Sequence, residues 1–279
     1  MAPLQCGFAI VTPASRGLGF AFAQQLLANT NIPVIATART NCDQLRSRLL
    51  ESVEAEGSRA EHRLKIFKVD VTDESTIREM TSAIREIYPD ALLRLAISVP
   101  GVLHVEKSPS QIDAKSSLQS FQVNALGPML LMKHLSSFLP TKSSPQFQDA
   151  EEPSGGSNPR WRLPVSHAIY AMMAARVGSV SDNTSGGWYS YRASKASIFQ
   201  VAKTFDLYLQ SRSRERAIAV ALHPGTVQTE FTKDYWGGRP MINPAESAAL
   251  LLRLLCSMGT GVKEGRGRCW DWNGQEVIP

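Results

Sequence analysis

Short apolar segments alternate with longer, partly polar segments along most of this chain, and this alternation constrains its fold more than any other feature. Each apolar run is short enough for a buried strand, and each segment between two runs is long enough for a helix. Strands and helices in alternation are typical of a parallel sheet covered on both faces. The sequence therefore predicts an α/β fold with strands at 8–12, 34–37, 64–69, 92–98, 167–174, 217–222 and 268–272, and helices at 20–28, 42–56, 74–87, 118–138, 191–212 and 244–256.

The alternation extends over the whole chain, so we expect one domain over residues 1–279. A chain of this length can bury a full core by itself. Residues 141–164 interrupt the pattern, because they are rich in Ser, Pro, Gly, Gln and Glu and poor in apolar residues. Such a segment buries little surface, and we expect a flexible surface insertion with Trp161 as its one apolar anchor.

Composition and charge argue against several classes of protein. The net charge of +5 is spread along the chain without a basic run, so we expect no nucleic-acid partner. The four cysteines form no C-x-x-C pair and no His cluster accompanies them, so we expect reduced thiols, no metal site and a cytoplasmic protein. We see no signal peptide after Met1, and Arg94 interrupts the best candidate for a membrane-spanning stretch.

A glycine-containing turn joins the first predicted strand to the first predicted helix, with the sequence Thr12-Pro13-Ala14-Ser15-Arg16-Gly17-Leu18-Gly19. Small residues at such a turn let the backbone approach a pyrophosphate. The helix N-terminus then presents unpaired N–H groups and the positive end of its dipole. This placement favours a dinucleotide-binding loop over a plain tight turn.

The segment Tyr191-Arg192-Ala193-Ser194-Lys195 opens the long helix predicted at 191–212. A spacing of four places Tyr191 and Lys195 on one face of that helix. A neighbouring ammonium favours the phenolate and lowers the pKa of the phenol. The pair is therefore expected to move a proton to or from a carbonyl oxygen.

Together these motifs resemble the short-chain dehydrogenase/reductase family. Residues 12–19 resemble its T-G-x-x-x-G-x-G signature, with Pro13 in place of the first glycine, and Tyr191 to Lys195 match its Y-x-x-x-K element. Because proline fixes φ and lacks an N–H, the loop is expected to follow a different path at Pro13. Residues 186–195 and 267–279 resemble the C-factor-like or sniffer-like carbonyl reductase branch.

The resemblance implies a Rossmann-like doubly wound parallel sheet, with homo-dimers or homo-tetramers formed through the two long helices. It also implies roles for further residues. Asn124 matches the asparagine that helps to hold a water-linked proton relay beneath the catalytic lysine. Two further groups match cofactor-contacting elements of the family, at the adenine and at the nicotinamide and pyrophosphate ends: Asp70 and Val71, and Pro224, Gly225, Val227 and Thr229.

The choice between NAD and NADP depends on the end of the second predicted strand, Thr37-Ala38-Arg39. A free ribose 2′-hydroxyl is bound by a carboxylate at this place, whereas a 2′-phosphate requires a cation. No carboxylate is present, and Arg16 of the loop is expected to approach Arg39. Two guanidiniums favour NADP(H) as the cofactor.

Two departures from the family pattern concern the active site. Ser98-Val99-Pro100-Gly101 replaces the family's N-N-A-G, and Ala174-Ala175 replaces the Ser-Ser that closes the fifth strand. The usual catalytic serine hydroxyl is therefore expected to be absent at Ala175, with Ser179 or Ser181 as substitutes. Loss of one such donor costs on the order of a hundredfold in rate.

We therefore expect an NADP(H)-dependent oxidoreductase that acts on a small-molecule carbonyl or alcohol, with Tyr191 as acid/base and Lys195 tuning it and holding the ribose. Residues 229–245 are expected to form a lid over the substrate. The apolar wall of the substrate pocket is predicted to consist of Phe231, Tyr235, Trp236 and Met241. Two alternatives stay open: an enzyme of this fold that catalyses dehydration, isomerisation or cyclisation, and a dinucleotide-binding protein without turnover.

Overall fold

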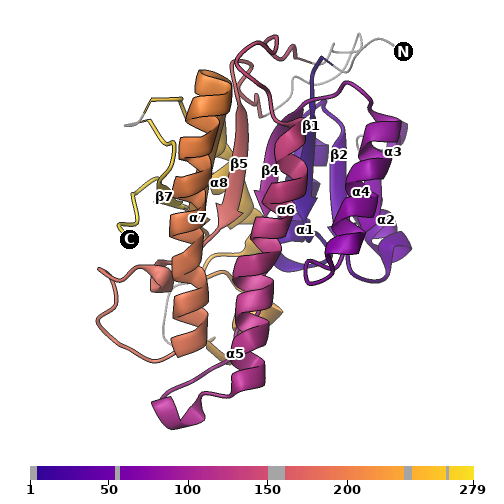
Figure 1. Ribbon diagram of the computed structural model, residues 1–279. Helices are drawn as coiled ribbons and strands as arrows, with labels where there is room; N and C mark the ends of the chain where they lie inside the picture. The colour runs from indigo at the N-terminus through magenta and orange to yellow at the C-terminus, as the bar shows by residue number, and fades with distance from the viewer. Residues whose placement is uncertain (1–4, 54–56, 150–160, 236–240, 262–263) are drawn as a thin grey trace.

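A parallel sheet of seven strands organises the part of the chain that the computed structural model describes, which is residues 5–53, 57–149, 161–235, 241–261 and 264–279 (Figure 1). The strand order is β3-β2-β1-β4-β5-β6-β7, and every pair is parallel. This is the Rossmann-like sheet expected from the sequence. The strands are β1 (Phe8–Thr12), β2 (Val34–Ala38), β3 (Leu64–Lys68), β4 (Leu93–Ser98), β5 (Ala168–Met173), β6 (Ala217–His223) and β7 (Cys269–Asp271).

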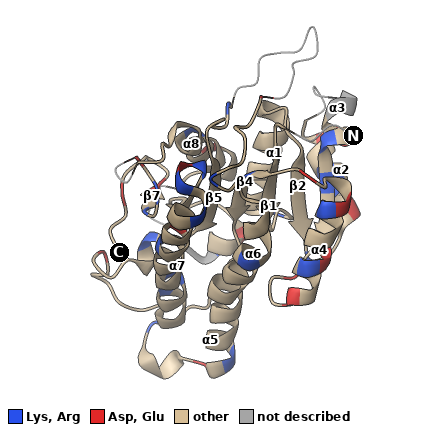
Figure 2. Ribbon diagram, turned by 45° about the horizontal axis from the view of Figure 1, so that its top comes forward, with Lys and Arg blue, Asp and Glu red and all other residues tan. Residues whose placement is uncertain are grey.

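Helices cover both faces of this sheet. Helices α1, α2 and α8 pack with one core cluster, whereas α4, α6 and α7 pack with the other, and Figure 1 shows the second group in front of the strands. Basic and acidic residues are interspersed along helices such as α2 and α4 (Figure 2). The α-helices are α1 (Gly17–Asn29), α2 (Cys42–Glu51), α3 (Gly57–Arg63), α4 (Glu74–Ile87), α5 (Ala114–Phe121), α6 (Gly127–Leu135), α7 (Tyr189–Ser213) and α8 (Pro244–Ser257).

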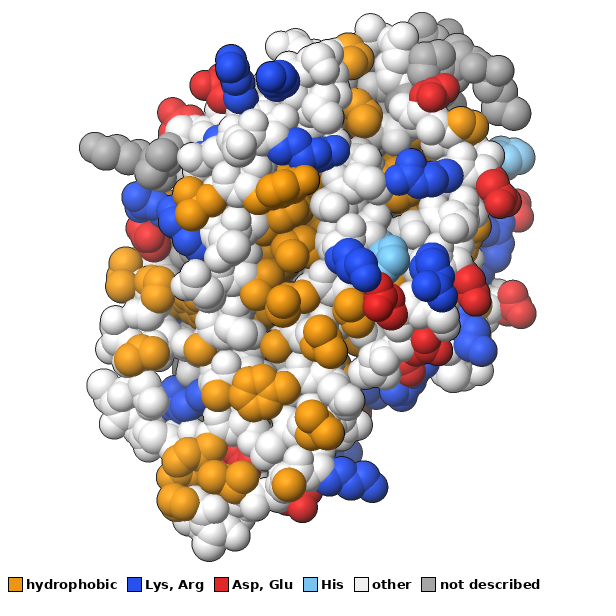
Figure 3. All heavy atoms as spheres, in the orientation of Figure 1, with side chains coloured by type: hydrophobic (Ala, Val, Ile, Leu, Met, Phe, Trp, Pro, Cys, Tyr) orange, Lys and Arg blue, Asp and Glu red, His pale blue; other side chains and the backbone are white. Residues whose placement is uncertain are grey.

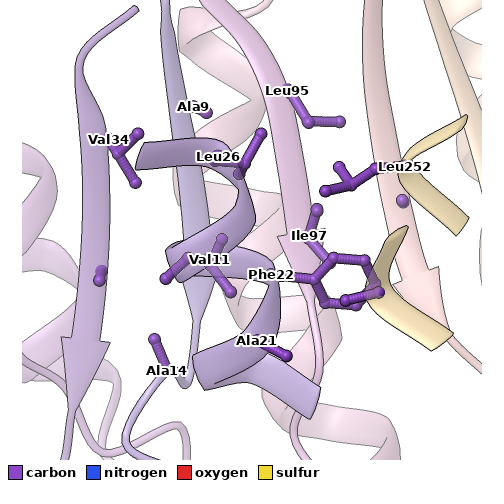
Figure 4. Packing of buried hydrophobic residues seen from close by; sticks show 14 of the residues in the cluster. Ala9, Val11, Ala14, Ala21, Phe22, Leu26, Val34, Leu95, Ile97 and Leu252 are labelled. Atoms are coloured by element: carbon purple, nitrogen blue, oxygen red, sulfur yellow. The ribbon is translucent and has the colours of Figure 1, made fainter. Parts of the chain in front are cut away.

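Strand β1 is buried on both faces, which explains why its sequence is continuously apolar instead of alternating. Ala9 and Val11 point into the cluster under α1 and α8, while Phe8 and Ile10 point into the opposite cluster. Figure 4 shows Phe22 of α1 beside Ile97 of β4 within the cluster under α1 and α8. Truncation of such a buried aromatic costs about 3–5 kcal/mol of stability.

The helix predicted at 118–138 is interrupted, and this is the largest local difference from expectation. It begins earlier, at α5, where Asp113 caps it by accepting a hydrogen bond from the N–H of Ser116. A π-helical turn, η3 (Gln122–Leu126), then separates α5 from α6. Pro128 has no N–H to donate to residue 124, so a regular α-helical bond cannot form there. Single π turns of this kind are frequent at functional sites.

Helix α2 is also shorter than the predicted 42–56, and a separate helix, α3, begins at Gly57. The helix ends at Glu51, where the Ser52 hydroxyl donates to the carbonyl of Leu49. This local hydrogen bond competes with the helical pattern, as serine side chains commonly do. Residues 54–56 of the prediction lie outside the described part.

The predicted surface insertion at 141–164 has more apolar anchors than expected. Phe147 and Leu163 are buried along with Trp161, so the expectation of a single anchor was wrong. Arg94 of β4 explains the difference, because its buried guanidinium donates to the carbonyls of Leu163 and Pro164 and pairs with Asp149. Arg94 thereby ties Asp149 and residues 163–164 to the sheet, and the central residues 150–160 of the insertion lie outside the described part.

A topological switch point lies between β1 and β4, because the chain moves outward from β1 in one direction to β2 and β3 and in the other to β4 and beyond. In open parallel sheets, ligands bind in the crevice at the carboxyl ends of the strands at this point. Two backbone hydrogen bonds order the crevice: Ala14 donates to Thr37, and Val99 donates to Thr12.

Candidate active site

The loop between β1 and α1 closes tightly on itself. Gly17 has a φ of +54°, and a Cβ placed on Gly19 would lie 2.0 Å from the carbonyl oxygen of Pro13. Only glycine fits at position 19 without moving the loop. The Thr12–Pro13 peptide bond is cis, and the different path expected at Pro13 stays a prediction. The N-cap residue of α1, Arg16, makes no side-chain capping bond.

Three buried hydroxyls at this edge of the sheet have no hydrogen-bond partner among the described residues: those of Thr12, Thr37 and Ser98. Each belongs to the last or next-to-last residue of β1, β2 or β4. A buried hydroxyl without a partner costs about 1–3 kcal/mol. These hydroxyls and the uncapped start of α1 fit a polar, anionic ligand such as a dinucleotide.

Of the residues predicted to hold the adenosine end, Arg39 follows β2, Asp70 and Val71 follow β3, and Arg16 immediately precedes α1. Arg16 and Arg39 are exposed. Partial burial raises the pKa of Asp70, but hydrogen bonds from Thr72 and the charge of Arg39 outweigh it, so the pKa lies below its usual range. Val71 packs against Gly127, where a Cβ would lie 2.9 Å from its side chain. The structure therefore brings Arg39 and Asp70 together at the predicted place.

Tyr191 and Lys195 both lie on the buried face of α7, at 6% and 3% exposure. The Nζ atom of Lys195 donates to the carbonyl oxygen of Met173 (2.8 Å), the last residue of β5, and to that of Pro100 (3.4 Å), which follows β4. Burial lowers the pKa of Lys195 to about 8. Burial also raises the pKa of Tyr191. The pKa of Tyr191 is thus not lowered as predicted from the neighbouring ammonium, because burial disfavours the charged phenolate.

Asn124 lies in the π turn η3 and is fully buried. Its side chain accepts from the N–H of Val102 at 2.7 Å and donates to the carbonyl of Val102 at 2.9 Å. Its Nδ2 also donates to Ser194 Oγ at 3.0 Å, and this hydroxyl donates to the carbonyl of Tyr191. Asn124 therefore links the segment after β4 to the first turn of α7.

Ala175 follows the end of β5, in extended backbone, and carries no hydroxyl. The Ser179 hydroxyl donates to the carbonyl of Ile278 and accepts from the N–H of Asp182, while Ser181 donates to the carbonyl of Pro279. Both candidate substitutes are thus bonded to the C-terminal segment. That Ser179 is catalytic remains a prediction.

The element after β6 meets the phosphate loop. A Cβ on Gly17 would lie 3.3 Å from the methyl carbon of Thr229, so Thr229 faces the start of α1. Gly225 has a φ of +79° and lies against the Trp272 indole, where a Cβ would be 2.7 Å away. Pro224 accepts a hydrogen bond from the Ser247 hydroxyl of α8. The predicted residues Pro224 to Thr229 therefore sit at the same crevice as the glycine loop.

Part of the predicted lid at 229–245 covers Tyr191. The rings of Phe231 and Tyr191 lie 6.0 Å apart between centroids. A Cβ on Gly101 would be 3.6 Å from Phe231 and 3.9 Å from Lys195 Nζ. Backbone hydrogen bonds of Ile242 with Thr226 and Gln228 close the base of this segment. Trp236 and the side chain of Tyr235 lie outside the described part.

Two contributors to this site were missed from the sequence. Glu106 is buried at 2% exposure, and its carboxylate accepts from the N–H and the hydroxyl of Ser190 at the start of α7. Its carbonyl accepts from the N–H of Trp188 at 2.6 Å. Trp188 has a φ of 52°, which is unusual for a residue with a side chain of this size. The centroids of the Trp188 and Tyr191 rings lie 6.1 Å apart. The positive φ was not readable from the residue type.

Within the described ranges, no group of three potential metal ligands occurs. The helices of those ranges also include none with the length and apolar character of a membrane span.

Comparisons with known proteins agree with this geometry. A family model described as short chain dehydrogenase matches residues 7–145. C-signal of Myxococcus xanthus is 30% identical over 167 residues, which make up 60% of this chain and 80% of that protein. This is the family and branch that the motifs predicted.

Solved structures share the fold. Carbonyl reductase Sniffer of D. melanogaster has a TM-score of 0.77 at 21% identity, over 98% of this chain and 99% of its own. A carbonyl reductase from chicken fatty liver, crystallised with NADPH bound, has a TM-score of 0.76 at 24% identity, over 97% of this chain and 98% of its own.

Proposed function

Since the chain belongs to the short-chain dehydrogenase/reductase family, we propose that it is an NADP(H)-dependent oxidoreductase acting on a small-molecule carbonyl or alcohol. The observation that carries the proposal is the burial of Tyr191 and Lys195 on one face of α7, beside the ends of β4 and β5. The NADPH bound to the chicken carbonyl reductase of the same fold supports the choice of cofactor.

NADPH, when bound, supplies the hydride for carbonyl reduction. The loop at 12–19 and the start of α1 would hold its pyrophosphate, and Arg16 and Arg39 would hold its 2′-phosphate. Asp70 and Val71 would contact the adenine, and the segment Pro224 to Thr229 would contact the nicotinamide and pyrophosphate ends. These groups fit because guanidiniums and helix N-termini bind phosphates.

Tyr191 is the proton donor in this proposal. Burial raises its pKa, so the phenol is protonated at neutral pH and can donate to a carbonyl oxygen. The charge of Lys195 counteracts this effect, since an adjacent ammonium stabilises the phenolate that proton transfer leaves behind. Asn124 holds the first turn of α7 through Ser194. This keeps Tyr191 and Lys195 in place during the transfer.

The proposal is tested by following NADPH absorbance with purified protein and a panel of ketones and aldehydes. Wild-type protein should consume NADPH with at least one carbonyl, and Tyr191→Phe should abolish consumption while it retains NADPH binding. Tyr208→Phe is the matched control, because Tyr208 is an exposed tyrosine on the same helix. Activity in Tyr191→Phe equal to that of wild type would overturn the proposed role.

A second candidate function is favoured by Ala175. Without a serine hydroxyl at that place, the site can use Tyr191 as an acid in a dehydration, isomerisation or cyclisation. The same assay separates these candidates from carbonyl reduction, since tight NADPH binding without consumption by any carbonyl favours either the second candidate or a dinucleotide-binding protein without turnover.

We further propose that the protein forms homo-oligomers through α5 to α7. Large exposed apolar side chains gather there (Figure 3), at Leu118, Phe121, Leu126, Met129, Leu207 and Tyr208. Light scattering of the protein as it elutes from a size-exclusion column should give the mass of a dimer or tetramer. The mass of a monomer would contradict the proposed homo-oligomer.

The four cysteines also bear on the compartment of the protein. All four are free, which supports a cytoplasmic protein.

A further inference from the structure

Arg48 lies in the last turn of α2, and its guanidinium reaches back to the phosphate loop. Its Nη1 atom donates to the carbonyl oxygen of Ser15 at 3.1 Å, across 33 positions of the sequence. The guanidinium also lies over the ring of Phe20, 4.5 Å from the centroid. These two contacts hold an exposed cation at the rim of the loop, since stacking on an aromatic ring fixes the plane of the guanidinium.

Arg48 shares this corner with both arginines already assigned to the cofactor. Arg16 directly follows Ser15 in the chain. The hydrogen bond from Ala14 to the carbonyl of Thr37 ties the loop to the end of β2, two residues before Arg39. Arg16 thus belongs to the phosphate loop, Arg48 donates to this loop, and Arg39 closely follows a residue bonded to it, so all three residues are connected to the loop at the carboxyl edge of the sheet.

No carboxylate of the described ranges forms an ion pair with Arg16, Arg39 or Arg48, although the charge of Arg39 reaches Asp70. Like charges that are not held in ion pairs repel one another. An anion at this place would relieve the repulsion, and Arg48 uses only one of its five N–H groups on Ser15.

Arg46 shows that this orientation is particular to Arg48. It lies two residues earlier on α2, but its guanidinium donates to the carbonyl of Leu64 and pairs with Glu61. One arginine of α2 is thus committed to the structure around β3, while the other points to the phosphate loop.

We propose that Arg48 is a specificity-determining residue that binds the 2′-phosphate of NADP(H) together with Arg16 and Arg39. The inference rests on the proposed function, because it requires that the crevice binds a dinucleotide. It adds to that function a cation from α2, which makes recognition of the 2′-phosphate depend on a third secondary-structure element.

The test measures dissociation constants of NADPH, NADH and 2′,5′-ADP by calorimetry, with no substrate present. Arg48→Ala should weaken NADPH and 2′,5′-ADP on the order of tenfold or more, and NADH by less than about twofold, because one charge-assisted hydrogen bond to phosphate is lost. Arg48→Gln keeps a donor for Ser15 and removes the charge, so it should weaken NADPH in the same way. Arg46→Ala is the matched control, because it removes the same charge from the same helix. It should leave the dissociation constants of both dinucleotides unchanged.

Three outcomes would overturn the inference. An equal loss of affinity for NADPH and for NADH in Arg48→Ala would mean that Arg48 only supports the loop through Ser15. An unchanged dissociation constant for NADPH in Arg48→Ala would mean that Arg48 makes no specific contact with the cofactor. An equal loss of NADPH affinity in Arg46→Ala would mean the same. These outcomes differ from failure of the proposed function, in which the wild-type protein itself binds neither dinucleotide.

Discussion

A serine at position 175 should raise the rate of carbonyl reduction. Ala175 is 9% exposed and its backbone is extended, with φ −155° and ψ 144°. Its carbonyl accepts from the N–H of Gly178 at 2.8 Å, and Gly178 packs on α7, where a Cβ would be 2.7 Å from the carbonyl carbon of Lys195. The short turn 175–178 is therefore fixed against the helix that carries Tyr191, so a hydroxyl added at its start is held in a defined position.

The expected gain follows from the value of one preorganised donor. Removal of such a donor costs roughly 10²–10³ in kcat. A new hydroxyl in a buried place also costs about 1–3 kcal/mol where it lacks a partner, so the gain should be smaller. We expect kcat for NADPH-dependent ketone reduction to rise about tenfold in Ala175→Ser, with the KM for NADPH unchanged.

The assay is steady-state NADPH oxidation at saturating ketone, with melting temperature as the check on folding. Ser179→Ala serves as the companion variant. If Ser179 supplies the missing hydroxyl, this variant should lose activity on the order of a hundredfold. If its bond to the carbonyl of Ile278 is its main role, the variant should instead lose stability. A fall or no change in kcat for a stably folded Ala175→Ser would refute the reasoning on position 175.

Three other predictions concern the loop, the start of α7 and a buried histidine. Gly19→Ala should weaken NADPH binding at least tenfold in calorimetry, because its Cβ would meet the carbonyl of Pro13 at 2.0 Å; unchanged affinity would contradict the tight loop. Glu106→Ala should cost about 1–2 kcal/mol in urea denaturation and lower kcat more than it raises the KM for NADPH, because it uncaps the first turn of α7. Glu106→Gln should recover most of both losses, and equal losses in the two variants would argue against the cap. Burial, with the charges of Arg216 and Arg266, lowers the pKa of His167 from 6.5 to about 4. Since the unfolded chain binds this proton below pH 6.5 and the folded chain only near pH 4, the free energy of unfolding should fall by up to about 3 kcal/mol as the pH drops through this window. His167→Gln should flatten that pH dependence, and an equally steep curve would assign it to other groups.

The amino-acid sequence by itself determined the alternation of strands and helices and the position of the phosphate loop. It also determined the Tyr191–Lys195 pair. These features are local, because strand and helix periodicity, turn-forming glycines and a spacing of four residues act over a few neighbouring positions. For the same reason the seven predicted strands match the observed strands to within one or two residues at either end.

Tertiary structure decided the features that depend on distant residues. Glu106 meets Ser190 across 84 positions and Arg48 meets Ser15 across 33, and neither contact has a signal in the local sequence. The π turn at Asn124 depends on Pro128 together with the side-chain bonds of Asn124 to Val102. The raised pKa of Tyr191 likewise comes from burial by the surrounding elements. Burial and long-range hydrogen bonds exist only after the chain has folded, and for that reason only the structure shows them.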